Sequence, residues 1–162
     1  MKDNTIYTGS FEEQYTLGVN PFVLGFIKTH PDATLPTSNH SDDSGYDVTA
    51  VEDTLIPARG RAQVPTGLEF ANIPVGSWVR IENRSGLGFK KGITCFNGII
   101  DTSYRGSAGV MVFNNTDEDY QVKRGDRIAQ LVVYPLIKPD VELTETKTET
   151  VRGDKGFGSS GM

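Results

Sequence analysis

The stretch Ser77-Trp-Val-Arg-Ile-Glu-Asn83 sets the fold class of this chain. Apolar and polar side chains alternate along it, with Val79 and Ile81 on one side and charged residues on the other, which is the period of a half-buried β-strand. Further short strands are expected over 22–28, 46–51, 62–64, 68–71, 110–113, 120–123 and 127–134, the run 110–113 being buried on both faces. Short strands at regular spacing predict an all-β fold, a jelly-roll-like antiparallel sandwich or barrel.

The rest of the chain predicts one β domain with an extension at each end. A polar N-terminal extension is expected over 1–20, the β domain over 21–138, and a flexible C-terminal arm over 139–162. The arm is rich in Thr, Glu and Lys and then in Gly, so it cannot build a core of its own. The single helix expected covers 85–91.

The amino-acid composition argues against several classes of protein. A net charge of −5 argues against a nucleic-acid binder, and it requires that a polyanionic substrate be held by local cations or a metal. The single cysteine, Cys95, excludes an intramolecular disulfide and a cysteine-rich zinc site. No apolar run approaches the length of about 20 residues that a membrane span needs. The start lacks the pattern of a signal peptide, so a cytoplasmic location is expected.

Two polar clusters, over 42–47 and 83–88, could carry chemistry. Asp42-Asp-Ser-Gly-Tyr-Asp47 offers three carboxylates that could hold Mg²⁺ directly or through water, although a simple Asx turn before a strand is the alternative. Asn83-Arg-Ser-Gly-Leu-Gly88 combines an arginine, a hydroxyl and the N–H groups of a helix start, which suits an anion. The alternative is a structural turn with Ser85 as the N-cap.

Three more clusters follow. Gly98-Ile-Ile-Asp-Thr-Ser-Tyr-Arg-Gly106 places a carboxylate in a turn after an apolar strand, as a general base or simply as a hairpin cap. Arg124-Gly-Asp-Arg-Ile-Ala-Gln130 is either part of a site or a hairpin corner with an Asp126–Arg ion pair. The tail segment 152–161 carries an arginine and a phenylalanine among glycines, which favours a mobile lid over a disordered end.

Taken in order, these five clusters resemble the five motifs of the trimeric dUTPase family, some of whose members are viral. Ser-Gly-Tyr-Asp-Val over 44–48, Arg-Ser-Gly-Leu-Gly over 84–88 and the segment 98–106 are similar to motifs one to three. Gly-Asp-Arg-Ile-Ala-Gln-Leu over 125–131 is similar to motif four. Arg-Gly with Gly-Phe-Gly-Ser-Ser-Gly over 152–161 is similar to motif five.

The resemblance implies hydrolysis of dUTP to dUMP and pyrophosphate, with Mg²⁺, in a homotrimer whose three sites are each built from three chains. Asp101 would activate the water that attacks the α-phosphorus, and Tyr104 would pack against the deoxyribose. Asp47 would bind the waters of Mg²⁺, Arg152 would pair with the γ-phosphate, and Phe157 would stack on uracil. The catalytic set is Asp101, Ser85 and Arg152, and the substrate-binding set is Arg84, Ser85, Gly86, Asn97, Gly98, Ile100, Asp101, Tyr104, Gln130, Arg152, Phe157, Gly158 and Ser159.

The chain departs from the family pattern at the base-binding segment. Many relatives carry an asparagine six residues before the catalytic aspartate, where this chain has Cys95, and Asn97 lies two residues later. The contact to uracil, expected from Gly98 within a β-hairpin, therefore uses backbone groups alone or a shifted Asn97.

Two other functions stay open. A dCTP deaminase shares the fold but needs a glutamate on the strand after motif three, and Val110-Met-Val-Phe-Asn114 has no acid. A regulatory module that works through a protein partner is the second alternative, with the extension 1–20 as a candidate binding segment.

Overall fold

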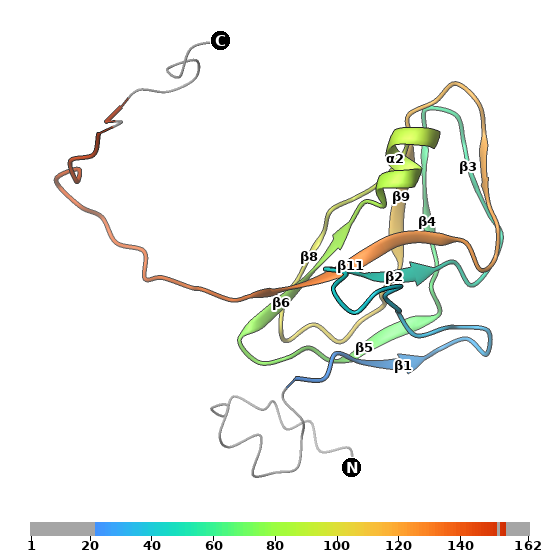
Figure 1. The fold of residues 1–162 in the computed structure, drawn as a ribbon, viewed down its shortest axis with the longest axis horizontal. Helices are drawn as coiled ribbons and strands as arrows, with labels where there is room; N and C mark the ends of the chain where they lie inside the picture. Colours follow the sequence, from blue (N-terminus) through green and yellow to red (C-terminus); the bar gives the residue numbers. More distant parts are fainter. Residues whose placement is uncertain (1–21, 152, 155–162) are drawn as a thin grey trace.

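The structure is a computed structural model, and it describes residues 22–151, 153 and 154 (Figure 1). Short strands and one helix make up the described chain. In order they are β1 (Gly25–Lys28), β2 (Tyr46–Thr49), β3 (Thr54–Ile56), β4 (Arg61–Val64), β5 (Leu68–Asn72), β6 (Ser77–Glu82), α2 (Ser85–Lys91), β7 (Ile93–Cys95), β8 (Ile99–Ile100), β9 (Val110–Asn114), β10 (Tyr120–Val122) and β11 (Arg127–Pro135). The all-β, jelly-roll-like prediction is confirmed.

Every strand pair in the described chain is antiparallel, and the pairs link strands that are distant in sequence. The largest sheet has the order β2-β11-β6-β8, and a second has the order β4-β9-β7. Two smaller sheets pair β1 with β5 and β10 with β3. Since consecutive strands go to different sheets, the chain wraps around one interior.

All four sheets contribute to a single core. The alternation predicted for β6 is present, with Ser77, Val79 and Ile81 buried and the residues between them half-buried. Val48, Leu131 and Ile100 join that core from the other strands of the same sheet. The fully or almost fully buried side chains from the remaining sheets include Ile56, Val64, Leu68, Phe70, Ile93, Val110, Val112 and Val122.

Some sequence expectations are wrong in detail. The run 110–113 was expected to be buried on both faces, but in β9 only Val110, Val112 and Asn114 are buried, because one face of this sheet is covered less. The turn 123–126 is not a hairpin corner, since β10 pairs with β3 and β11 pairs with β2 and β6. Asp126 accepts a hydrogen bond from the main-chain N–H of Lys123 instead of pairing with an arginine.

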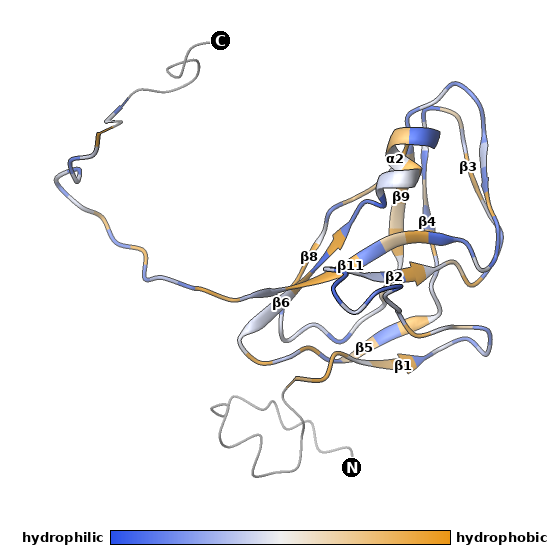
Figure 2. Cartoon of the chain, viewed as in Figure 1, coloured by the Kyte–Doolittle hydropathy of each residue, from blue (hydrophilic) through white to orange (hydrophobic). Residues whose placement is uncertain are grey.

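Beyond Pro135 the chain leaves the β domain as an extended segment (Figure 1). Figure 2 colours this segment by residue hydropathy and shows apolar positions along it. Their side chains are exposed to solvent: Ile137 by 85%, Val141 by 98% and Leu143 by 101%. Isolated exposed apolar residues are common, but a row of them on a segment outside the domain leaves apolar area for another surface to cover. In the described part of the chain, no helix is long and apolar enough to cross a membrane.

Cys95 lies in the core at the end of β7, as its apolar neighbours predicted, with 7% exposure. Burial raises the pKa of its thiol to about 11, and the nearby Glu82 carboxylate adds to the shift. The thiol is thus protonated far above neutral pH.

We expect the Cys95 thiol of the native protein to react with a disulfide reagent at pH 8 at least about a hundredfold more slowly than that of the unfolded protein, because the thiolate is the reactive form. Absorbance of the released thiolate measures both rates, and equal rates would contradict the burial of Cys95.

Candidate active site

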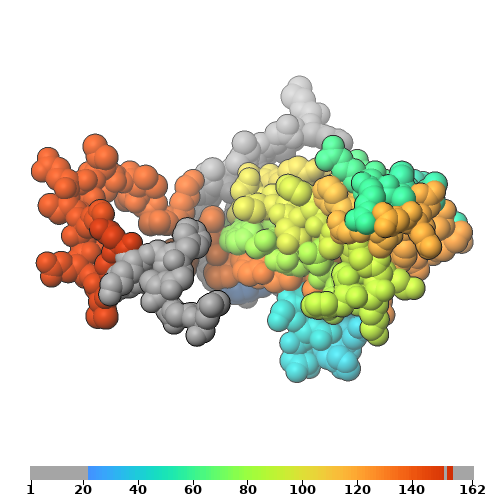
Figure 3. Space-filling model, turned by 90° about the horizontal axis from the view of Figure 1, so that it is seen from above, coloured from blue at the N-terminus to red at the C-terminus, as the bar shows by residue number. Residues whose placement is uncertain are grey.

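A polar cleft of about 220 Å³ lies between the segment that precedes β2, the start of α2 and the middle of β11. The segment before β2 projects from the body beside α2 (Figure 3). The polar cleft is lined by hydroxyl, amide, carboxylate and guanidinium groups, from Ser38, Asn39, Asp43, Ser44, Gly45, Asp47, Arg84, Ser85, Gly86 and Gln130. Three sequence clusters that are far apart along the chain therefore meet here.

The sheet register explains this meeting. β11 runs antiparallel between β2 and β6, so Gln130 lies opposite Asp47 on one side and opposite Glu82 on the other. Two residues after Glu82 the chain reaches Arg84 and then enters α2. The residues predicted from the first, second and fourth clusters are thus held by neighbouring strands of one sheet.

Asp47 is the centre of the polar cleft's charge network. Arg84 donates from Nε to Asp47 Oδ1 at 2.8 Å and from Nη2 to Oδ2 at 3.3 Å. Arg127 donates from Nη1 to the same Oδ2 at 3.0 Å. The Asp47 side chain is only 13% exposed, and the two guanidinium groups compensate its buried charge. In this network two guanidinium groups share one carboxylate, and Asp43 adds a second carboxylate to the cleft lining.

The acidic run before β2 forms a turn. The Asp43 carboxylate accepts hydrogen bonds from the main-chain N–H groups of Asn39 and His40, both at 2.9 Å. The bond from His40 is the main cause that lowers the pKa of Asp43. Arg127 also donates to Asn39 Oδ1 at 3.1 Å, which ties the loop to β11. The turn alternative is confirmed for Asp43, while Asp47 belongs to the charge network.

Gln130 lies directly over the backbone of Gly45. Its Nε2 donates to the Asn83 carbonyl at 3.0 Å, and a methyl group at Gly45 would approach Gln130 Oε1 to 2.5 Å. A side chain at position 45 would therefore have to displace the Gln130 amide.

We expect Gly45→Ala to displace the Gln130 amide from the polar cleft. A lost hydrogen bond between this amide and a charged ligand in the cleft costs about 1.5–3 kcal/mol, so catalytic efficiency should fall roughly ten- to a hundredfold. Steady-state kinetics measure the loss. Gly76→Ala is the matched control, since nothing lies within 4 Å of an added methyl there, although its φ of 71° makes a small stability loss expected. Unchanged kinetics for Gly45→Ala would contradict the role given to the Gln130 amide.

Ser85 begins α2 rather than capping it. The N-cap residue is Arg84, with φ −87° and ψ 124°, and it makes no side-chain capping bond, so the interpretation of Ser85 as the N-cap is wrong. The first N–H groups of a helix lack partners inside the helix. The main-chain N–H groups and the hydroxyl at Ser85 and Gly86 are therefore available to an acceptor in the polar cleft.

Asp101 lies at the opposite end of β6 from this polar cleft. In the pairing of β6 with β8, Arg80 faces Ile99 and Val79 faces Ile100, which brings Asp101 beside Trp78. Thr102 Oγ1 also donates to the Ser77 carbonyl. From residue 78 to residue 84 the strand advances roughly 20 Å, at about 3.3 Å per residue. One chain therefore cannot bring its own Asp101 to its own polar cleft.

The turn after Asp101 is stiff and carries an accessible aromatic ring. The Tyr104 N–H donates to the Asp101 carbonyl at 3.0 Å, and the Tyr104 hydroxyl donates to the Ser107 carbonyl at 3.1 Å. The Tyr104 ring meets Phe70 edge-on, with centroids 5.9 Å apart, and is 43% exposed. An added methyl at Gly106 would clash with this tyrosine. The ring is held in one place with an open face.

The segment before Asp101 differs from its expected form. The predicted β-hairpin is wrong, because β7 pairs with β9 and β8 pairs with β6. The Gly98 N–H donates to the Phe96 carbonyl, and the Gly98 carbonyl accepts from Ile81. Ile100 has a buried side chain, so only its main chain could meet a ligand. Asn97 is half-buried, with Oδ1 3.8 Å from the Cys95 sulfur.

Four predicted residues, Arg152, Phe157, Gly158 and Ser159, lie outside the described residues.

Two residues that hold the site together, Arg127 and Asn83, were not among the predicted site residues. Arg127 was seen only as part of its cluster, because a residue three before Gln130 would lie on the opposite face of a regular strand, and the register shift between Arg127 and Ala129 is not visible in the sequence. Asn83 accepts the Cys95 N–H with Oδ1 at 2.6 Å and so fastens β7 to the end of β6. Nothing in the sequence around Asn83 indicates that bond.

The chain is similar to known proteins in both sequence and fold. A sequence model described as dUTPase matches residues 31–161. A deoxyuridine 5'-triphosphate nucleotidohydrolase of Arabidopsis thaliana is 47% identical over 130 residues, which cover 80% of this chain and 78% of that protein. The protein of that name from Paramecium bursaria Chlorella virus 1 is 43% identical over 80% of this chain and 92% of its own.

Solved structures of phage proteins have the same fold. A Staphylococcus bacteriophage 80alpha dUTPase with dUPNHPP superimposes with a TM-score of 0.80 at 28% identity, covering 87% of this chain and 99% of that one. A dUTPase from phage phi11 of S. aureus, described for its coordination of a structural Mg(II) ion, has a TM-score of 0.71 at 25% identity, covering 76% and 97%.

Proposed function

Because this chain belongs to the dUTPase family, we propose that it hydrolyses dUTP to dUMP and pyrophosphate with the polar cleft and the Asp101 turn as the two halves of each active site. The observation that carries the two-part site is the separation of roughly 20 Å along β6 between the Asp101 turn and the polar cleft of one chain. A base must lie within hydrogen-bond reach of the water it activates. A complete site therefore needs the Asp101 turn of one chain beside the polar cleft of another.

A homotrimer with shared sites fits these requirements. Closed rings of identical subunits are built from head-to-tail contacts, in which one surface meets a different surface of the next copy. The two separated halves provide such a pair of surfaces. The apolar side chains of the extended segment after Pro135 support the same assembly, since a neighbouring copy would cover them.

In the proposed reaction, the Asp101 carboxylate takes a proton from the water that attacks the α-phosphorus. The stiff turn around it fixes its position, and the open face of Tyr104 would pack on the deoxyribose ring. In the polar cleft, the Ser85 hydroxyl, the N–H groups at Ser85 and Gly86, and the Gln130 amide would hold phosphate oxygens. Arg84, already fixed by Asp47, adds positive charge where the leaving pyrophosphate gains negative charge.

The residues fit Mg²⁺ that arrives with the triphosphate rather than a metal held by the protein alone. The described residues contain no group of three or more His, Cys, Asp or Glu side chains that could cage a metal. Asp47 has both oxygens bonded to arginines, so it would reach the ion through water, and Gln130 Oε1 is a second oxygen donor. Mg²⁺ characteristically keeps several waters and binds phosphates, and it would neutralise charge on them.

Arg152 and Phe157 complete the proposed site from a third chain. The arginine would pair with the γ-phosphate, and the ring would stack on uracil while Gly158 and Ser159 bring the backbone close to the nucleotide. Selection of uracil would rest on main-chain groups near Gly98 and Ile100, with Asn97 beside them, because a mismatched buried polar group costs about 1–3 kcal/mol.

Two further expectations remain proposals. A cytoplasmic location is supported by the single buried cysteine, which leaves the chain without an intramolecular disulfide. Binding of a protein partner by residues 1–20 would be a second role beside catalysis.

Deamination of dCTP is disfavoured because β9 carries no acid. Incubating the protein with each deoxynucleoside triphosphate and Mg²⁺ should give pyrophosphate from dUTP, and ammonia from dCTP would overturn the assignment.

Mixing two inactive variants tests the shared site directly. Asp101→Asn removes the base, and Ser85→Ala removes a cleft hydroxyl. After co-expression at equal levels, three quarters of the trimers contain both chains, and one of the three sites in each has both intact halves. Activity should therefore return to about a quarter of the native value. Sites built within one chain would give no recovery, since every chain lacks one half.

A further inference from the structure

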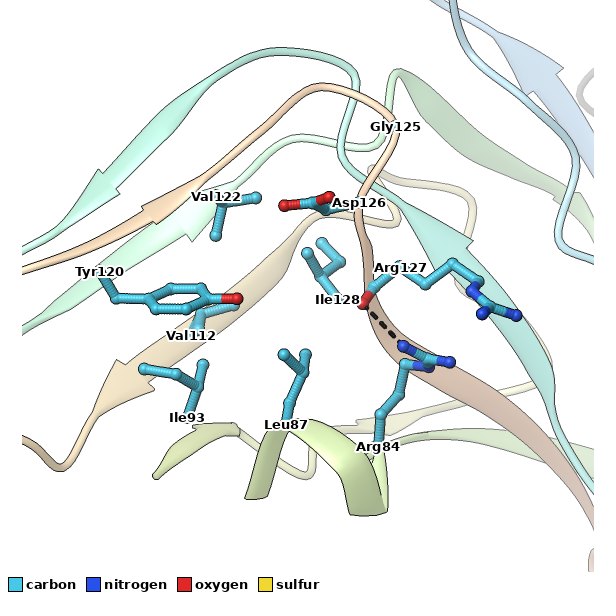
Figure 4. A pocket seen from close by; sticks show the side chains of 10 residues that line it. All are labelled: Arg84, Leu87, Ile93, Val112, Tyr120, Val122, Gly125, Asp126, Arg127 and Ile128. Atoms are coloured by element: carbon cyan, nitrogen blue, oxygen red, sulfur yellow. Dashed lines mark hydrogen bonds between the residues drawn. The ribbon is translucent and has the colours of Figure 1, made fainter. Parts of the chain in front are cut away.

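A second cavity lies behind the polar cleft, and Figure 4 shows it from close by. This back pocket has a volume of about 310 Å³ and is enclosed by α2, β7, β9, β10 and the start of β11. Its floor is apolar, formed by Leu87, Ile93, Val112, Val122 and Ile128. The volume is at the lower end of the range for small-molecule sites. The back pocket is thus large enough for a single ring or a short branched chain.

The mouth of the back pocket carries two acceptors. The Tyr120 hydroxyl and the Asp126 carboxylate both point into the cavity (Figure 4). Asp126 Oδ2 accepts the Lys123 N–H at 2.9 Å, but Asp126 Oδ1 and the Tyr120 hydroxyl have no hydrogen-bond partner among the described residues. Burial and then the Asp126 charge raise the pKa of Tyr120, which keeps its hydroxyl protonated.

Arg84 separates the back pocket from the polar cleft and lines both. Its Nη1 donates to the Arg127 carbonyl at 3.1 Å on the back-pocket side, the bond drawn in Figure 4. Its Nε and Nη2 bind Asp47 on the other side. Arg127 also lines the back pocket, and its guanidinium binds the same Asp47 carboxylate. Two carboxylates, Asp47 and Asp126, therefore balance the two guanidinium groups, so the mouth carries no net positive charge that would repel a cation.

We propose that the back pocket binds a small organic cation, with an apolar body on the Leu87, Val112 and Val122 floor and an ammonium head at Asp126 and Tyr120. An ammonium group has only donors, which matches a carboxylate oxygen and a hydroxyl without partners. Such a ligand also touches Arg84, so its binding is coupled to the nucleotide in the polar cleft. Coupling between two sites is reciprocal: each ligand changes the affinity for the other by the same factor.

Benzylammonium is a suitable probe, with benzyl alcohol and benzoate as neutral and anionic analogues of the same size. Titration of the full-length trimer, followed by NMR of Leu, Val and Ile methyl groups, should shift the Leu87, Val112 and Val122 signals in a saturable way. Benzoate should leave them unchanged. Asp126→Asn should weaken benzylammonium binding about threefold, as expected for an ion pair with an exposed carboxylate, and Tyr120→Phe should weaken the binding as well.

Glu52→Gln is the matched control, because it removes one exposed carboxylate that lines neither cavity. Its benzylammonium affinity should equal that of the native protein. Equal affinity for benzoate, shifts confined to other methyl groups, or an unchanged affinity in Asp126→Asn would each overturn the proposal. A saturating non-hydrolysable dUTP analogue should change the affinity for benzylammonium, and no change would refute the link through Arg84. Hydrolysis measured without the probe keeps the test separate from the proposed function.

Discussion

We expect Asp101→Asn to lower the turnover of dUTP by about a hundred- to ten-thousandfold, the range of a positioned general base, while the affinity for the nucleotide stays within a few-fold. The amide has nearly the same shape as the carboxylate but cannot take a proton from the attacking water. Because the Asp101 side chain is exposed and makes no hydrogen bond within the described residues, its replacement should leave the fold unchanged. Pyrophosphate release measures turnover, and calorimetry with a non-hydrolysable analogue measures affinity.

The matched control is Asp117→Asn, which removes an exposed carboxylate that pairs with Arg59 on the surface. Exposed pairs of this kind contribute little, so its turnover should equal that of the native protein. A native rate in Asp101→Asn would mean that another group activates the water. Loss of affinity and rate together would instead assign Asp101 to nucleotide binding.

Removing residues 152–162 should reduce turnover at least about a hundredfold, because the proposed γ-phosphate arginine and the uracil-stacking ring are lost together. The segment 136–151 stays in this variant, and with it the apolar side chains proposed to contact a neighbouring copy. Light scattering should therefore still report three chains. In the full-length protein, Arg152→Ala measures the part of the lost turnover that is due to the arginine charge, and Phe157→Ala measures the part that is due to ring stacking. Turnover at the native level in the truncated protein would refute the lid.

Local pattern made much of the fold predictable. The alternation over 77–83 predicted β6, and the helix expected over 85–91 is α2, which begins at Ser85 and ends at Lys91 and is the single helix of residues 22–151. The strands β3 and β7 were not foreseen, because each has only three residues and shows no period, whereas the equally short β10 lies within the expected strand 120–123. The pairing of the strands could not be predicted from local sequence either, because it depends on contacts such as that of β10 with β3, which lie more than 60 residues apart.

The candidate site was predictable as a set of residue types and not as an arrangement. Glycine-flanked clusters identified Asp47, Arg84 and Gln130, which the sheet register brings into one cleft. The commitment of the Asp47 carboxylate to two arginines could not be read from the sequence, because Arg127 reaches it only through the register of β11 against β2. The distance of Asp101 from that cleft likewise required the pairing of β6 with β8.

The length of β6 separates the two halves of the site and so ties activity to the amount of assembled protein. Under the proposed assembly an isolated subunit is inactive, so specific activity should fall steeply once the protein is diluted below the dissociation constant of the trimer. A cell that makes both native and base-defective copies would lose working sites in proportion to the defective fraction. The defective copies still carry intact polar clefts. Each of these clefts is active only where a native neighbour contributes its Asp101.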